Sequence, residues 1–204
     1  METHMENKKM LYSHVSVDCV LLGVNEDKLC VLLVERKIDN SDEKHYKLPG
    51  SLIYENEDLD TAAYRVFNEA TGLKRVPLKQ FRSFGSPSRT KNADDMQWLE
   101  NAMKLKIERI VTVAYLALSK IGRKSNPTNK YNSLAWFPVD SLPALPFDHR
   151  EIIEAAVEEI REWVEKEPSI IFDYLPLKFT AYQLRRTYEI IYNKEMDVRN
   201  FHKK

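Results

Sequence analysis

The chain has 204 residues, of which 43% are hydrophobic and 30% are charged, a balance typical of a globular protein with one domain or one domain plus a small appendage. Lysine plus arginine and aspartate plus glutamate number 31 each, so the overall charge favours no particular class of partner. No apolar run has the length of a membrane span, and the first ten residues lack the apolar core of a signal peptide, so we expect a cytoplasmic protein.

The N-terminal part of the chain is predicted to form a β-hairpin. Two apolar runs, residues 14–24 and 29–34, flank a short polar turn, a pattern that favours paired strands. Cys19 and Cys30 lie within these runs without the spacing of metal ligands, so we expect both to be reduced and buried. Arg36 follows the second run, where it either reaches a ligand at the sheet edge or remains a solvated cation.

Residues 48–73 are predicted to form a strand end, a tight Leu-Pro-Gly turn and a helix, because Pro fixes φ and Gly permits conformations closed to other residues. Asp60 is the expected N-cap, and Gly72 is expected to end the helix in the left-handed region. An apolar stripe at helical spacing is formed by Ala62, Ala63, Val66, Phe67 and Ala70.

The central part of the chain alternates predicted strands with loops. After a strand at residues 78–84, Arg89 either pairs bidentately with a diphosphate or acts as a plain loop cation. Residues 91–106 show partial helical spacing and are a lid over a pocket, a packing helix at a subunit interface or a partly disordered insertion. Strands are predicted at residues 107–118 and 134–137.

Helices are predicted for the C-terminal third. One runs from Phe147 to about residue 164 with Asp148 as its N-cap, and His149 at its start either touches a ligand or bonds locally. After a linker, Thr180 caps a second helix, and Asp197 caps a third behind a short turn, which is the helix-turn-helix plan. Residues 178–204 carry seven cations and three anions, enough positive charge for several phosphate contacts.

Residues 51–73 resemble the Nudix box. That family pattern is Gly, five residues, Glu, seven residues, Arg-Glu, an aliphatic residue, any residue, Glu-Glu, any residue, Gly and an aliphatic residue. The spacing is kept without a gap, and the positions that match are Glu57, Arg65, Glu69, Gly72 and Leu73. Three positions depart from the pattern: the opening Gly is Ser51, the Glu after the Arg is Val66, and the second Glu of the pair is Ala70.

The resemblance implies an α/β fold, a Nudix α/β/α sandwich with a mixed sheet. Nudix hydrolases cleave a diphosphate, usually with Mg²⁺, and the catalytic residues retained here are Glu57, Arg65 and Glu69. Glu57, Glu69 and Glu108 would be the carboxylates available to Mg²⁺, which prefers hard oxygen ligands. Because the box keeps so few carboxylates, we expect weak or absent Mg²⁺ binding and impaired hydrolysis. From the residues alone, a helix with ordinary surface glutamates is the alternative.

The resemblance also implies a binding site for ADP-ribose or a related nucleotide diphosphate. In Nudix domains that handle ADP-ribose, a Phe-Gly and a short loop with an Arg precede a long strand, and Phe84, Gly85 and Arg89 are similar to that element. The residues expected to contact the ligand are Arg36, Glu69, Arg89 and His149.

The C-terminal segment resembles the winged helix of Nudix-related transcriptional regulators of the NrtR and AraR type. The matching residues are Phe179, Thr180, Gln183, Leu184, Tyr188, Glu189, Asp197, Arg199, Asn200 and Phe201. The resemblance implies a homodimeric bacterial regulator that contacts operator DNA through Arg199, Asn200, His202 and Lys203. Since the family's β-hairpin wing would follow Lys204, we expect a truncated or incomplete DNA-binding unit.

We therefore expect a Nudix-like unit at residues 10–165 and a helix-turn-helix segment at residues 170–204. The rival hypothesis is an active Mg²⁺-dependent pyrophosphatase that hydrolyses ADP-ribose or a nucleotide sugar. A third hypothesis is a Nudix domain used only for contact with another protein.

Overall fold

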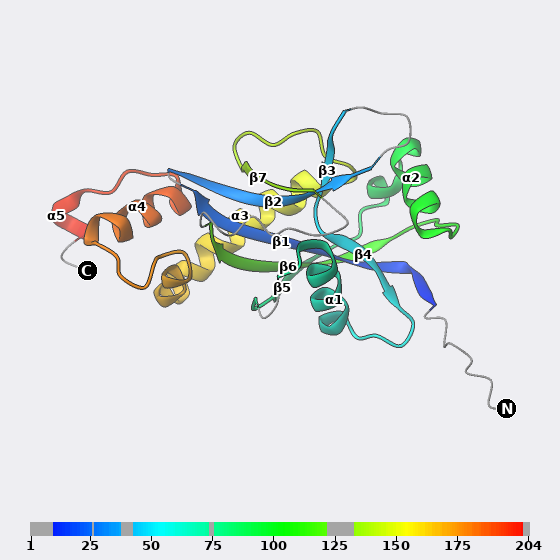
Figure 1. The fold of residues 1–204 in the computed structure, drawn as a ribbon, viewed down its shortest axis with the longest axis horizontal. Coiled ribbons are helices and arrows are strands. Elements are labelled where there is room, and N and C mark those ends of the chain that lie inside the picture. The colour runs from blue at the N-terminus through cyan, green and yellow to red at the C-terminus, as the bar shows by residue number, and fades with distance from the viewer. Residues whose placement is uncertain (1–9, 26, 38–42, 74–75, 122–132, 202–204) are drawn as a thin grey trace.

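A mixed β-sheet crosses the centre of the molecule (Figure 1). The structure, a computed structural model, describes residues 10–25, 27–37, 43–73, 76–121 and 133–201. Within these residues the sheet has seven strands in the order β3-β2-β1-β6-β5, with β4 paired to β1 and β7 paired to β2. The strands are β1 (Leu11–Asn25), β2 (Lys28–Arg36), β3 (His45–Lys47), β4 (Gly50–Tyr54), β5 (Lys79–Phe84), β6 (Val111–Lys120) and β7 (Leu134–Pro138). β1 and β6 run parallel, and the other pairs are antiparallel.

Helices cover both faces of this sheet. They are α1 (Leu59–Thr71), α2 (Ala93–Met103), α3 (His149–Lys166), α4 (Ala181–Tyr192) and α5 (Val198–Phe201), with short 3-10 helices η1 (Pro87–Thr90) and η2 (Pro168–Asp173). Figure 1 shows α4 and α5 at one end of the molecule and α2 at the other. The expected α/β/α sandwich with a mixed sheet is confirmed.

The two layers of the core follow from the alternation of side chains along β1. Val20 and Leu22 point to the face that packs against α3, together with η2 and Ile191 of α4. Cys19 and Leu21 point to the opposite face, which packs against α1. Because both faces are covered, the central strands are continuously apolar in sequence. Both cysteines are free and buried, as expected.

The predicted hairpin is confirmed as β1 and β2, and α1 follows the turn after β4. Asp60, however, is not the N-cap of α1. Asp58 takes that place, because its Oδ1 accepts the Thr61 N–H at 2.7 Å. Asp60 instead accepts the hydroxyl of Tyr115 at 2.6 Å. Gly72 ends α1 in the left-handed region with a φ of 71°, as expected.

Two further boundaries differ from the prediction. Asp148 precedes α3, but its side chain makes no capping hydrogen bond because the carboxylate pairs with Arg89 instead. β6 begins at Val111 rather than at Ile107, since Ile107 and Ile110 turn away to pack against Leu52 in a small separate cluster.

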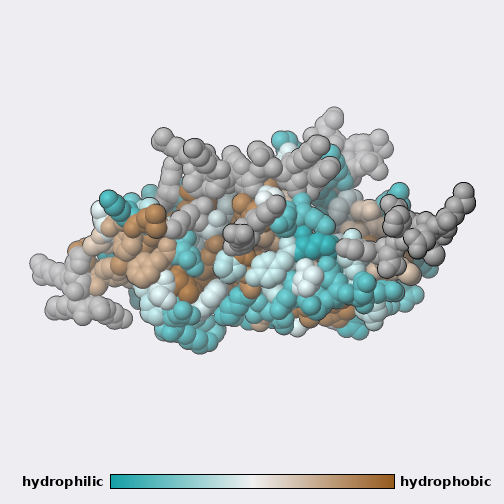
Figure 2. Space-filling model, turned by 60° about the horizontal axis from the view of Figure 1, so that its bottom comes forward, coloured by the Kyte–Doolittle hydropathy of each residue, from teal (hydrophilic) through white to brown (hydrophobic). Residues whose placement is uncertain are grey.

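The C-terminal unit begins with a strongly specified helix. Thr180 and Gln183 form a reciprocal capping box at the start of α4, which confirms the predicted cap. Ile191 of α4 is fully buried against the sheet-facing core. The outer surface of the unit keeps large exposed side chains, and apolar surface gathers at this end of the molecule (left in Figure 2). These side chains are Phe172, Leu177, Phe179, Tyr182 and Val198.

Among the residues that the structure describes, no helix is both long enough and apolar enough to cross a bilayer.

Candidate functional site

A buried cluster of charged side chains lies where β1, η1 and the start of α3 meet. Arg89 donates through Nη2 to Asp18 Oδ2 at 2.9 Å and through Nη1 to Asp148. Arg89 and Asp18 are each 5% exposed at the side chain. Burial raises the pKa of Asp18, but attraction to His149 and Arg89 outweighs it, so the pKa lies below its ordinary value. Asp18 therefore stays ionised beneath the surface, held by the guanidinium.

His149, predicted to touch a ligand, is buried in the same cluster. Its Nδ1 accepts the Leu48 N–H at 3.2 Å, so the proton of the neutral ring belongs on Nε2, which lies 3.6 Å from Asp18 Oδ1. Burial lowers the pKa of His149 to about 4, against the attraction of Asp18. At neutral pH the ring is uncharged and connects the Leu-Pro-Gly turn to the carboxylate below it.

Lys47, at the end of β3, was not singled out from the sequence. Its Nζ donates to the carbonyl oxygens of Leu48 and Gly50, each at 3.0 Å. Burial lowers the pKa of this ammonium below its ordinary value, and Asp18 opposes that effect. Gly50 must lack a side chain, because a Cβ there would lie 1.9 Å from Asp18 Oδ1. Two features of the sequence could have indicated this arrangement. Lys47 lies directly before the Leu-Pro-Gly turn, and Asp18 is a charged residue inside an apolar strand.

The segment predicted as a lid, an interface helix or an insertion folds as α2 and covers Arg36. Arg36 Nη1 donates to Asp95 Oδ1 at 2.5 Å, and the guanidinium lies over the Trp98 ring at 4.2 Å. Asp95 also accepts the Phe147 N–H at 3.1 Å, which ties α2 to the loop before α3. Arg36 is buried, and its Nε has no hydrogen-bond partner among the described residues. The segment is therefore an ordered cover, and Arg36 is not a solvated cation.

A small cavity lies between α2 and the buried charges. It measures about 40 Å³ and is lined on one side by Lys47, Arg89 and His149 and on the other by Trp98 and other apolar side chains of α2. That volume suits one or two water molecules, whereas sites for drug-sized ligands run from roughly 300 to 1,000 Å³. This cavity, with α2 in place, is therefore too small to hold a nucleotide.

The retained box residues come together as an ion-pair network between α1 and the loop that precedes it. Arg65 donates to Glu57 twice, from Nε to Oε1 and from Nη2 to Oε2, both at 2.7 Å, and to Glu69 Oε2 at 3.3 Å. Glu57 also accepts the Tyr54 N–H at 3.1 Å. The Glu57 side chain is 8% exposed and that of Glu69 is 63% exposed. The guanidinium thus neutralises the carboxylates that the sequence assigns to catalysis.

The predicted metal set of Glu57, Glu69 and Glu108 is not assembled. Across the described part of the chain, no group of three or more His, Cys, Asp or Glu side chains is arranged to hold a metal ion. The physical reason is that both Glu57 oxygens face Arg65, while Glu108 lies exposed in the loop before β6. The described residues therefore form no three-ligand protein site for a divalent cation.

Helix α5, which carries two of the predicted DNA-binding residues, lies at the end of the molecule opposite α2 (Figure 1). Arg199 and Asn200 belong to α5, whereas His202 and Lys203 lie outside the described residues. In the preceding helix, buried Glu189 pairs with Arg185 and Arg186 and accepts the Met196 N–H at 2.9 Å. Glu189 therefore positions the turn that leads into α5.

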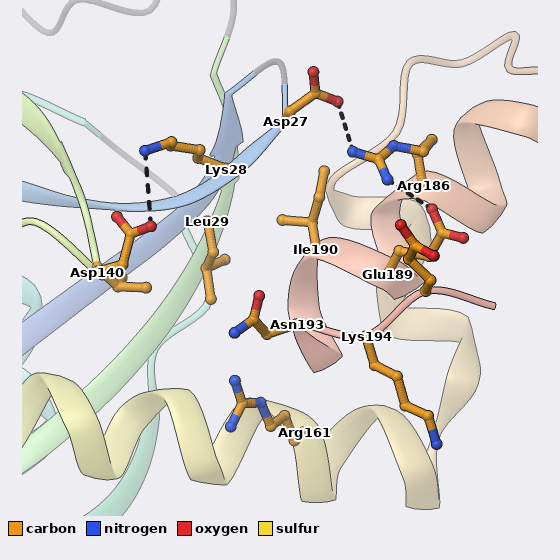
Figure 3. Close-up of a pocket in the computed structure, with 12 residues that line it drawn as sticks. Asp27, Lys28, Leu29, Asp140, Arg161, Arg186, Glu189, Ile190, Asn193 and Lys194 are labelled. Carbon is orange, nitrogen blue, oxygen red and sulfur yellow. Dashed lines mark hydrogen bonds and ion pairs between the residues drawn. The ribbon is translucent and has the colours of Figure 1, made fainter.

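A larger cavity, about 260 Å³, marks the joint between the two units (Figure 3). Arg161 of α3 points toward Asn193 at the end of α4, and its Nε donates to the Ile191 carbonyl at 2.8 Å. On the other side of the cavity, Asp27 accepts Arg186 Nη2 at 2.8 Å. The joint is thus built from a helix-end contact on one wall and an ion pair on the other.

Comparison with known proteins gives two family matches. A model of the NUDIX domain matches residues 12–156, and a model of the NrtR DNA-binding winged helix domain matches residues 171–204. The ADPR responsive transcriptional repressor NtrR of Acinetobacter baylyi is 24% identical over 195 residues, covering 93% of this chain and 71% of that protein. The ADP-ribose pyrophosphatase of Methanocaldococcus jannaschii is 26% identical over 149 residues, covering 72% of this chain and 76% of that protein.

Solved structures of Shewanella oneidensis NrtR share this fold. The structure complexed with a 27mer DNA superposes with a TM-score of 0.68 at 24% identity, covering 93% of this chain and 80% of that one. The NUDIX domain complexed with ADP ribose superposes with a TM-score of 0.53 at 28% identity, covering 73% of this chain and 89% of that one.

Proposed function

The chain belongs to the NUDIX domain family, and from that premise we propose that it is a cytoplasmic transcriptional regulator that responds to ADP-ribose or a related nucleotide diphosphate. The Nudix unit binds the ligand without hydrolysing it efficiently. The C-terminal winged-helix unit binds operator DNA, and the protein acts as a homodimer.

The ion-pair network around Arg65 is the main support for the proposal that the Nudix unit hydrolyses its ligand poorly. Metal-dependent cleavage of a diphosphate needs carboxylates free to hold the cation and to activate water. Here Arg65 engages Glu57 through both carboxylate oxygens and also donates to Glu69. Val66 and Ala70 add no carboxylate to that helix face. A site of this composition supports binding of a phosphate ligand more than its cleavage.

The arginines Arg36 and Arg89 are the proposed diphosphate contacts. In this structure they pair with Asp95 and Asp148, and a guanidinium can form the same charge-assisted hydrogen bonds with phosphate oxygens. The Nε of buried Arg36 has no hydrogen-bond partner among the described residues and is a further available donor. The ADP-ribose complex of the Shewanella oneidensis NUDIX domain supports this choice of ligand.

The proposed DNA contacts are Arg199, Asn200, His202 and Lys203. The match of residues 171–204 to the NrtR winged helix supports this assignment, as does the excess of cations after Lys178. Ligand binding in the Nudix unit shifts the two winged-helix units of the dimer relative to each other. By linkage, DNA then changes the affinity for the ligand by the same factor.

Calorimetry and a turnover assay on the purified protein test this proposal together. We expect ADP-ribose to bind with measurable heat, to change the affinity for operator DNA in a gel shift, and to yield little AMP in the presence of Mg²⁺. If ADP-ribose is neither bound nor hydrolysed, the result would instead support a domain used only for contact with another protein.

The second candidate function is an active pyrophosphatase. The retained Glu57, Arg65 and Glu69 and the similarity to the Methanocaldococcus jannaschii enzyme favour it. Rapid Mg²⁺-dependent release of AMP that Glu69→Gln abolishes would establish this function and refute the non-hydrolytic site.

A further inference from the structure

Lys47 lies at the boundary between two hollows of the Nudix unit beside the box, and Gly50 and Ser51 line both hollows with it. It lines the small cavity that also holds Arg89 and His149. It also lines an open hollow of about 170 Å³ beside Ser51, Glu69 and Ala70 on the α1 side. A cation at this boundary faces any anionic group that extends from one hollow into the other.

The contacts of the Lys47 ammonium are those of a bound cation. Two backbone carbonyls, Leu48 O and Gly50 O, accept its protons at 3.0 Å each. Carbonyl oxygens are hard ligands of the kind that divalent metals also choose. Both carbonyls belong to the rigid turn that Pro49 and the close packing of Asp18 on Gly50 hold in place, so the ammonium has a defined position.

The described residues of this region form no three-ligand metal site. The described residues offer no suitable cluster of three ligands, and the retained carboxylates beside the turn are bonded to Arg65. A positive charge is nevertheless present there, supplied by the protein itself. An ammonium has three donors, so two bonds to carbonyls leave one N–H for a ligand oxygen.

We propose that the Lys47 ammonium takes the place of the divalent metal and binds the diphosphate of the nucleotide directly, so that ligand binding does not depend on Mg²⁺. This inference rests on the proposed binding of ADP-ribose. It assigns a charge-assisted hydrogen bond from Nζ to a phosphate oxygen. Because an ammonium neither polarises water as a metal does nor activates it, the same residue explains binding without cleavage.

Calorimetric titration of the full chain with ADP-ribose, in buffer containing either Mg²⁺ or EDTA, tests the inference directly. We expect the wild-type affinity to be the same in both buffers. If binding occurs only with Mg²⁺, the role of Lys47 is refuted while the proposed function stands. If ADP-ribose does not bind in either buffer, the proposed function itself fails. This measurement needs no variant and so does not depend on the stability of one.

Two lysine variants provide a second test of the role proposed for Lys47. Lys47→Gln is expected to weaken ADP-ribose binding in EDTA by about tenfold or more, the effect of losing one charge-assisted hydrogen bond. Lys79→Gln is the matched control, because Lys79 lies on β5 and pairs with Glu159 rather than with the turn. Wild-type affinity in Lys47→Gln, or an equal loss in Lys79→Gln, would refute the assignment. Partial rescue of Lys47→Gln by Mg²⁺ would support it further.

Discussion

Arg186 of α4 and Asp27 of the β1–β2 turn form an ion pair of 2.8 Å that joins the two units of the chain. The same guanidinium donates through Nη1 to Glu189 at 2.7 Å, and Glu189 accepts the N–H of Met196, two residues before α5 begins at Val198. A continuous set of polar contacts therefore runs from the edge of the Nudix sheet to the helix proposed to enter DNA. Such a set is a physical route for coupling, and it is open to direct test.

Replacing Arg186 tests this route. We expect Arg186→Met to reduce the factor by which ADP-ribose changes DNA affinity, measured by gel shift with and without ligand. The stability cost should be small, from 0 to about 1 kcal/mol, because the Asp27 side is exposed. Lys28→Met, which removes the exposed Lys28–Asp140 pair on the same turn, is the control. An unchanged ligand response in Arg186→Met would rule out this route.

Replacing Arg89 tests the buried charge cluster. Arg89→Met leaves the carboxylates of Asp18 and Asp148 without their shared cation, so we expect a loss of about 3–5 kcal/mol in the free energy of unfolding by urea. Arg150→Met is a suitable control, because Arg150 is exposed and bonds only to loop carbonyls among the described contacts. A loss below about 1 kcal/mol for Arg89→Met would show that the cluster is hydrated rather than dry.

The pKa of His149 predicts acid sensitivity. Its value of about 4 lies below the ordinary 6.5, so between these pH values the unfolded chain binds a proton that the folded chain does not. Stability should therefore fall as pH drops from about 6.5 to about 4, by roughly 3 kcal/mol in total. In His149→Asn the amide oxygen can still accept the Leu48 N–H. We expect the free energy of unfolding by urea to change less with pH between about 4 and 6.5 in this variant than in the wild type. A slope retained by the variant would assign the effect to other groups.

Removing Asp95 tests whether α2 restricts entry to the site. Asp95→Ala eliminates the bonds to Arg36 and to the Phe147 N–H, so we expect faster amide hydrogen exchange in α2 and a higher association rate for ADP-ribose. Asp94→Ala, at the neighbouring exposed position, is the matched control. If α2 exchanges no faster in Asp95→Ala than in the wild type, other contacts hold the helix in place.

Local structure was predictable wherever neighbouring residues decide it. The hairpin of β1 and β2, the left-handed end of α1 at Gly72 and the capping box at Thr180 depend on residues close together in the chain. The wrong prediction of the N-cap of α1 also concerned a choice between neighbouring residues. Asp58 and Asp60 are both able to cap α1, and the choice was settled by Tyr115, 55 residues away, whose hydroxyl binds Asp60.

The candidate site was predictable only in part, because its members come from distant positions. The sequence indicates Arg36 and Arg89 as candidate ligand contacts, but it does not indicate their partners. Asp95, Asp18 and Asp148 lie 59, 71 and 59 residues away from the arginines that they pair with. Lys47 carries no periodicity or spacing signal. Its importance arises from the turn that folds two carbonyls back onto its ammonium.

The amino-acid sequence alone determined the family, the order of the elements and the loss of carboxylates at Val66 and Ala70, because spacing along a helix and residue type are local properties. Only the tertiary structure decided how charges far apart in the chain pair: Asp18 with Arg89, Arg89 with Asp148, and Arg36 with Asp95. Charge pairing depends on distance and burial, and both are set when the sheet and its helices pack.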